Sequence, residues 1–145
     1  MELIFASNNP HKLEEIRNIV GNSFTILNLS QAHCEGEIPE TGNTLEENAL
    51  QKARWVYERT GKNCFADDTG LEIDALNGAP GVYTARFAGE HCTPKDNIVK
   101  TLSLLKNEPN RTARFRTVIA CIFDGKEYLF EGEVVGKIAT EEIRK

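Results

Sequence analysis

The strongest constraint on the fold is a hairpin signal in the last third of the chain. Asp124-Gly125 separates two long runs rich in β-branched and aromatic residues, at positions 113–123 and 127–135. Asp-Gly favours a two-residue hairpin turn, because both turn positions need a positive φ that these residues tolerate. The sequence therefore predicts a sheet with an antiparallel pair of long strands.

The first half of the chain alternates strand and helix patterns. Residues 3–6 and 24–29 are short strand-like runs on either side of a helical pattern that ends at Gly21. A capping-box pattern at residues 44–47 predicts the start of a second helix, and Gly61 predicts its end. The expected apolar face of the first helix holds Leu13, Ile16 and Ile19 or Val20.

The middle of the chain predicts shorter elements. Residues 64–66 form a short apolar strand that leads into Asp-Asp-Thr-Gly at 67–70, which is common turn chemistry. Residues 71–75 then alternate as a half-exposed strand. Thr93-Pro94 is a favourable start for a third helix, whose apolar positions are Ile98, Leu102 and Leu105.

Composition fits one globular α/β domain over residues 1–145, with a mixed central sheet flanked by helices. Hydrophobic residues make up 40%, enough for a real core, and the formal net charge of -5 offers no broad basic surface for nucleic acid. No apolar run approaches the roughly 20 residues that span a bilayer, and no signal-peptide pattern is present. The scattered cysteines predict reduced thiols in a cytoplasmic protein. They are Cys34, Cys64, Cys92 and Cys121.

A polar cluster lies where the first strand meets the first helix. The N-terminus of a helix presents unpaired N–H groups and a partial positive charge, which favour phosphate. The alternative is that Ser7 or Asn9 only caps the helix and that Lys12 is a solvated surface charge. The cluster also lacks the glycines of a P-loop. Its members are Ser7, Asn8, Asn9, Pro10, His11 and Lys12.

Acidic residues farther along form a candidate Mg²⁺ site. Asp67 and Asp68 follow an apolar run, Glu40 lies at a bend before the second helix, and Lys52 lies two turns into that helix. Mg²⁺ prefers oxygen ligands and is usually held by one or two carboxylates plus substrate phosphates. The alternative is that these residues are turn acids on a solvated surface. In a strand, alternation would send Asp67 and Asp68 to opposite sides.

Four blocks in this order resemble one family, the inosine/xanthosine triphosphate pyrophosphatases. The blocks are Ser7-x-Asn9-x-x-Lys12, Glu40-Thr41-Gly42 with Glu47-Asn48-Ala49 and Lys52-Ala53, residues 66–71, and residues 78–87. The resemblance implies a two-lobed α/β fold, Mg²⁺ as cofactor and usually a homodimer. It also implies hydrolysis of ITP, dITP or XTP to the monophosphate and pyrophosphate, which removes deaminated purines from the nucleotide pool.

The same resemblance assigns roles to individual residues. Residues 7–12 and Lys52 would bind the triphosphate, and Thr69 would contact the substrate. Glu40 and Asp68 would hold Mg²⁺. Asp68 would also be the base that activates the attacking water.

The chain departs from the family at its C-terminal end. Relatives continue with a Phe-Gly-Tyr-Asp segment and a later Ser-His-Arg that help hold the purine, and neither occurs here. We therefore expect a fold that lacks its C-terminal part, with exposed apolar surface. One alternative is a non-catalytic nucleotide- or metal-binding fragment. Another is the septum-associated nucleotide pyrophosphatases, but their opening Ser-Pro-Arg-Arg motif is replaced here by Asn-Pro-His-Lys at 9–12.

Three further side chains are expected to serve structure. Arg114 and Arg116 lie on one face of a predicted strand, where solvent exposure is the simpler expectation than a nucleotide clamp. Trp55, on the second helix, is expected to pack against the protein instead of stacking on a base. Arg86 lies inside the glycine-rich block, where substrate contact and a structural role are equally open.

Overall fold

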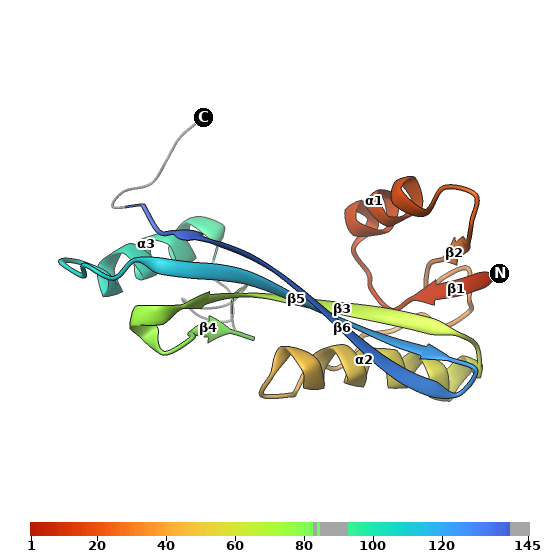
Figure 1. Cartoon of the computed structure of the whole chain (residues 1–145). Helices are drawn as coiled ribbons and strands as arrows, with labels where there is room; N and C mark the ends of the chain where they lie inside the picture. The colour runs from red at the N-terminus through yellow and green to blue at the C-terminus, as the bar shows by residue number, and fades with distance from the viewer. Residues whose placement is uncertain (83, 85–92, 140–145) are drawn as a thin grey trace. The chain divides into compact units, whose positions relative to one another are not determined.

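The computed structural model describes residues 1–82, 84 and 93–139 and has a mixed α/β fold (Figure 1). Six strands form one sheet in the order β2-β1-β3-β5-β6, and β4 pairs with β3. β1 is parallel to β2 and β3, while β4 is antiparallel to β3. The expected mixed sheet with helices is confirmed. The elements are β1 (Glu2–Phe5), α1 (Pro10–Val20), β2 (Thr25–Leu27), α2 (Leu45–Thr60), β3 (Cys64–Ile73), the short 3₁₀ helix η1 (Asp74–Leu76), β4 (Pro80–Gly81), α3 (Pro94–Leu104), β5 (Thr112–Phe123) and β6 (Lys126–Lys137).

The chain divides into two compact units. The first unit contains residues 1–68 and 118–131, and the second contains residues 69–117 and 132–145. β3, β5 and β6 each contribute residues to both units. Within the described residues, no helix is both long and apolar enough to cross a membrane.

In the first unit, α1 covers the paired strands β1 and β2. Leu13 packs with Phe5 and Ile26 in a buried cluster. Val20 packs against this cluster, whereas Ile19 is 82% exposed, so the expected face runs through Val20 and not Ile19. The reason is helical geometry, because a residue seven positions after Leu13 returns to nearly the same side and one six positions after does not.

The ends of α2 follow the sequence prediction. The Thr44 hydroxyl accepts the N–H of Glu47 at 3.1 Å, and Gly61 closes the helix in the left-handed region with φ 64°. The reciprocal bond of a capping box is absent, because the Glu47 carboxylate accepts the N–H of Asn43 instead. Along α2, Ala49, Ala53 and Val56 are buried.

β3 is one continuous strand, which corrects the predicted turn at residues 67–70. Its first residues pair with β1, with Ile4 opposite Cys64, and its last residues pair with β4, with Leu71 opposite Gly81. Partners at both ends supply the hydrogen bonds that a strand needs. Such pairing outweighs the local turn preference of Asp, Thr and Gly.

The second unit has its own core around α3 and the adjoining strands. Thr93 and Asp96 form a full capping box, with bonds of 3.1 and 2.8 Å. Leu105 packs with Ile73 and Ala113. Ile98, expected on the buried face, is 38% exposed. The buried residues of this segment, Thr101 and Leu105, therefore lie at the C-terminal end of α3.

The predicted hairpin is present. β5 and β6 are joined by Asp124 and Gly125, whose φ angles are 52° and 80°. Positive φ at both positions is the signature of the turn that the dipeptide favours. Every residue of β6 is exposed. Its large apolar side chains are Tyr128, Leu129, Phe130, Val134 and Val135.

Candidate functional site

The loop between β1 and α1 carries the predicted phosphate-binding residues. Asn9 caps α1, and its Oδ1 accepts the N–H groups of His11 and Lys12 at 3.0 and 3.2 Å. The Ser7 hydroxyl accepts the N–H of Asn9 at 3.1 Å. The capping role that the sequence left open for Asn9 is therefore real. The cap uses the acceptor oxygen of Asn9 and does not consume its amide donors.

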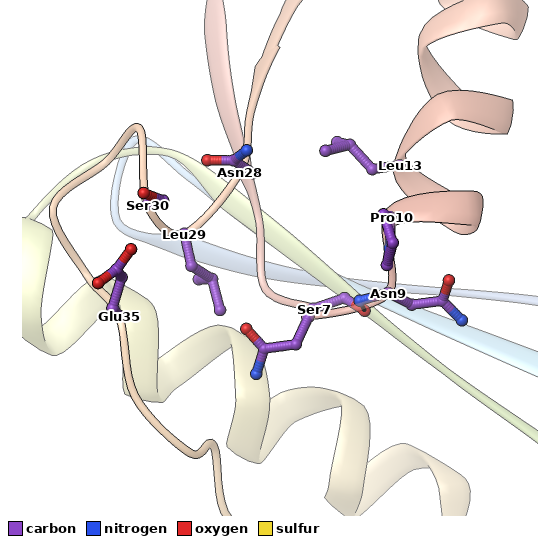
Figure 2. A pocket seen from close by; sticks show the side chains of 9 residues that line it. Ser7, Asn9, Pro10, Leu13, Asn28, Leu29, Ser30 and Glu35 are labelled. Carbon is purple, nitrogen blue, oxygen red and sulfur yellow. Dashed lines mark hydrogen bonds between the residues drawn. The ribbon is translucent and has the colours of Figure 1, made fainter.

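Two pockets of the first unit share this loop. Figure 2 shows the smaller one, with Pro10 and Leu13 on α1 and Ser7 and Asn9 on the preceding loop. It has a volume of about 290 Å³ and is lined by Ser7, Asn8, Asn9, Pro10, Leu13, Asn28, Leu29, Ser30 and Glu35. The second has a volume of about 610 Å³ and is lined by Ala6, Ser7, Asn8, Asn9, Pro10, Glu37, Ile38, Glu40 and Lys52. The second pocket brings the phosphate loop together with Glu40 and Lys52.

Two lysines, one from each helix of the first unit, meet its acidic residues. Lys12 Nζ lies 2.9 Å from Asp67 Oδ2, so Lys12 is more than a solvated surface charge. Lys52 Nζ lies 2.9 Å from Glu40 Oε1 and also donates to the main-chain oxygen of Asp67. The Lys52 side chain is only 11% exposed. These contacts draw the loop before α1, the bend at Glu40 and β3 to one place.

The two neighbouring aspartates of β3 point to opposite sides, as strand alternation requires. Asp67 lies on the side of α1, where it pairs with Lys12. Asp68 lies on the side of α2, where it interacts with Lys52 and Asn48. The acids that are adjacent in sequence therefore serve different neighbours.

Burial raises the pKa of the Asp68 carboxyl above its ordinary value. The positive charge of Lys52 and a side-chain hydrogen bond from Asn48 lower the pKa, while the negative charges of Glu40 and Asp67 raise it further. Desolvation is the largest cause. Asp68 is thus a carboxylate in a partly dry, crowded site.

The residues present fit a divalent cation. Within the described residues, Asp67 Oδ1 and Asp68 Oδ2 are buried and have no hydrogen-bond partner. A buried carboxylate oxygen without a partner is costly, and a cation would offset that cost. The described residues contain no group of three or more His, Cys, Asp and Glu side chains that could hold a metal. Mg²⁺ usually takes one or two carboxylates and completes its shell with water and substrate phosphates.

Other predicted residues lie elsewhere or outside the described residues. Thr69 belongs to the second unit, where its Oγ1 lies 2.8 Å from Thr117 Oγ1. Arg86, the open candidate of the glycine-rich block, lies outside the described residues. In the same block, the Thr84 hydroxyl accepts the N–H of Leu71 at 2.8 Å.

The expectation that both strand arginines face solvent is wrong for Arg116. Arg114 and Arg116 both pair with Glu72, at 2.7 and 3.1 Å. The Arg116 side chain is 14% exposed. Trp55 packs against a protein side chain, as expected, because the Arg59 guanidinium lies over its ring at 4.0 Å.

One polar residue near the acids was assigned no role from the sequence. Asn48 is buried, with 3% exposure, and its Oδ1 accepts the N–H of Gly42 at 2.7 Å. The sequence feature that could have revealed this role is a polar amide next to the apolar positions Ala49 and Ala53, which are buried in α2. A buried polar side chain usually exists to satisfy a specific partner.

Comparison with known proteins places the chain among a group of enzymes. A family model described as the Ham1 family matches residues 3–145. The dITP/XTP pyrophosphatase of Flavobacterium johnsoniae is 51% identical over 138 residues, which cover 95% of this chain and 72% of that protein. The dITP/XTP pyrophosphatase of Porphyromonas gingivalis is 52% identical over 141 residues, which cover 97% of this chain and 73% of that protein.

Solved structures show the same likeness. The Staphylococcus aureus Ham1 protein matches with a TM-score of 0.91 and 37% identity, over 99% of this chain and 74% of that chain. A nucleoside-triphosphatase and dITP/XTP pyrophosphatase from Mycobacterium abscessus matches with a TM-score of 0.88 and 37% identity, over 100% of this chain and 78% of that chain. This chain therefore spans about three quarters of the length of these proteins.

Proposed function

Because the chain belongs to the Ham1 family, we propose that it hydrolyses non-standard purine nucleoside triphosphates, such as dITP and XTP, to the monophosphate and pyrophosphate. The curated relatives that carry this activity in their names are about half identical to it. The observation within the molecule that best supports the activity is the pocket lined by the residue 7–10 loop, Glu40 and Lys52. It combines donors for phosphate with an acid for a cation.

The phosphate loop is our proposed site for the triphosphate. Asn9 Oδ1 binds the first N–H groups of α1, so the donors open to phosphate are the side chains of Ser7, Asn9 and Lys12 beside the positive end of the helix dipole. Lys52 reaches the same pocket from α2. Two ammonium groups can neutralise negative charge that grows on the departing pyrophosphate. Thr69 stays a proposed substrate contact.

Glu40 and Asp68 are our proposed ligands for Mg²⁺. The support is chemical, since both are carboxylates close enough for Glu40 to affect the pKa of Asp68, and Asp68 has a buried oxygen without a partner in the described structure. A bound Mg²⁺ supplies charge neutralisation at the phosphate oxygens.

The proposed reaction is an in-line displacement at the α-phosphorus. Asp68 orients a water molecule and accepts its proton while the new oxygen–phosphorus bond forms. The bond from the α-phosphorus to the bridging oxygen breaks, and pyrophosphate leaves with the bonding electrons. Lys12, held at 2.9 Å from Asp67, is positioned to meet that charge.

The proposal extends to assembly and location. The family resemblance supports a homodimer. Free cysteines support the reducing cytoplasm. The described ones are Cys34, Cys64 and Cys121.

Pyrophosphate release from dITP and XTP tests the proposed activity, with ATP and GTP as comparison substrates and EDTA as the metal-free control. We expect preferential release from dITP and XTP that stops on addition of EDTA and returns with excess Mg²⁺. Asp68→Asn should lower kcat about 10²- to 10⁴-fold, which is the usual contribution of a general base. A wild-type chain that binds dITP without releasing pyrophosphate would instead support the non-catalytic alternative.

A further inference from the structure

The bend that carries Glu40 is attached to α2 by successive side chains of that helix. Gln51 forms two bonds with Thr41, at 2.8 and 2.9 Å. Asn48 accepts the N–H of Gly42 at 2.7 Å. One residue further along the bend, the N–H of Asn43 is bound by Glu47. The path of this bend therefore depends on the helix surface beneath it.

Asn48 differs from Gln51 and Glu47, the other side chains of α2 that bind the bend, because it also faces Asp68. Its side chain is buried, and it lies close enough to Asp68 to lower the pKa of that carboxyl. Its Oδ1 is used by Gly42, so the amide N–H₂ is the group that can donate to Asp68. One side chain thus contacts both the bend of Glu40 and the strand of Asp68.

Gly42 allows the close approach that this contact needs. A Cβ added at Gly42 would lie 2.6 Å from Glu47 Cβ and 2.8 Å from Asn48 Oδ1. Both distances are shorter than carbon and oxygen atoms tolerate, and Glu47 Cβ is fixed to the helix. Any larger residue at position 42 must therefore push the bend away from α2.

We propose that Asn48 is a positioning residue that holds Glu40 and Asp68 in register for a divalent cation. Lys52, one helical turn further along α2, binds the Glu40 carboxylate directly at 2.9 Å. Asn48 binds the main chain at Gly42, two residues after Glu40, and it lies beside Asp68 of β3. This inference rests on the function proposed above, because it takes Glu40 and Asp68 as the metal ligands.

Mn²⁺ binding tests the inference without turnover. Free Mn²⁺ is titrated with the folded chain and followed by electron paramagnetic resonance, and the Mg²⁺ activation constant is measured separately with dITP. Asn48→Ala should raise the Mn²⁺ Kd and the Mg²⁺ activation constant about 10- to 100-fold, the usual effect of losing a group that orients a metal ligand. Gly42→Ala should raise both values in the same direction while Asn48 is intact.

Val56→Ala is the matched control. Val56 is fully buried two turns after Asn48 on the same helix, so its truncation lowers Tm without touching the acids. We expect the Mn²⁺ Kd of Val56→Ala to stay within twofold of the wild type. This separates a loss of positioning from a general loss of stability.

Each outcome decides one question. If Asn48→Ala binds Mn²⁺ as tightly as Val56→Ala does, the inference is overturned, even where the wild type turns over dITP. If Asn48→Ala does not fold, the Kd of Gly42→Ala decides in its place. If the wild type releases no pyrophosphate from dITP but Asn48→Ala still weakens Mn²⁺ binding, the positioning role stands and the proposed function fails.

Discussion

The 2.9 Å contact between Lys12 Nζ and Asp67 Oδ2 ties the phosphate loop to β3 at the scale of single residues. Lys12→Ala should lower kcat/KM for dITP about 10- to 100-fold. A hydrogen bond to a charged group is worth ~1.5–3 kcal/mol, and each ~1.4 kcal/mol is tenfold. Steady-state release of pyrophosphate measures the effect. Lys62→Ala, at an exposed lysine just after α2, is the control. Equal rates for the two variants would exclude Lys12 from the phosphate site.

Cys64 is a second residue with a distinct chemical expectation. Burial, followed by its neighbours Cys121 and Cys34, raises the pKa of the Cys64 thiol to about 12. At pH 8 such a thiol is only ~10⁻⁴ thiolate, whereas a free cysteine with a pKa near 8.5 is roughly a quarter thiolate. We expect iodoacetamide to leave Cys64 unmodified in the folded protein and to label it after unfolding in urea.

The labelling is measured by mass spectrometry of proteolytic peptides in a Cys92→Ser background, which removes the cysteine outside the described residues. A raised pKa means that the reactive thiolate grows about tenfold for each pH unit until about pH 12. Native labelling of Cys64 at the rate of an exposed thiol would show that β3 opens readily near this residue.

Which residues could be foreseen depended on whether their partners are local. The family resemblance predicts that Lys12, Glu40 and Asp68 share one site. The structure brings the residue 7–10 loop, Glu40 and Lys52 to one pocket and pairs Lys12 with Asp67. The roles of these residues stay a prediction. The link between Asn48 and Gly42 was not, because the path of the bend from Glu40 onward is fixed only by the helix it rests on. Arg116 was misplaced for the same reason, since its pairing with Glu72 needs the register of two strands.

At the scale of elements, helix ends were predictable and one strand was not. The starts of α2 and α3 and the end of α2 depend on single capping residues, which the sequence displays directly. β3 depends instead on partners far away in sequence, β1 on one side and β4 near its end. Asp-Asp-Thr-Gly has local turn chemistry, so non-local pairing had to override it.

Gly61 gives the prediction that belongs to this scale. Gly61→Ala should lower the free energy of unfolding by about 1 kcal/mol, because alanine pays a steric penalty in the left-handed region where this residue has φ 64°. An added Cβ would meet nothing within 4 Å, so the cost is conformational and not a clash. Urea unfolding measures it.

Gly132→Ala is the matched control for this substitution. Gly132 lies in β6, and its added Cβ also meets nothing within 4 Å, but its φ does not lie in the left-handed region. Gly132→Ala should be neutral or slightly stabilising. If both variants lost the same free energy of unfolding, the left-handed backbone at Gly61 would impose no particular cost on alanine.

At the scale of the whole molecule, the fold class was predictable and the strand order was not. A hairpin signal and two strand–helix repeats were enough to expect a mixed sheet. The placement of β3 between β1 and β5 brings together segments far apart in sequence, and no local pattern encodes it. The division into units is similar, because residues 118–131 join residues 1–68 across a long stretch of chain.

The exposed apolar side chains of β6 lead us to expect that the protein self-associates in concentrated solution. β6 is the last strand of the sheet in the described structure, and all of it is exposed. Long exposed edge strands with apolar side chains promote pairing between copies. Phe130 and Val134 lie on one side of the strand by alternation and are 58% and 72% exposed. We expect the apparent mass to rise beyond that of two 16.2 kDa chains as concentration increases.

Substituting lysine at both positions should suppress this growth, because charge on an edge strand opposes strand pairing. Light scattering coupled to size exclusion measures the mass across a concentration series. Ile19→Lys is the control, since Ile19 is 82% exposed on α1, away from the strands. A single exposed apolar residue rarely drives association, so this variant should behave as the wild type does. If the Phe130→Lys/Val134→Lys variant still grows with concentration while its Tm is unchanged, the association must come from another surface, and β6 would be excluded as its cause.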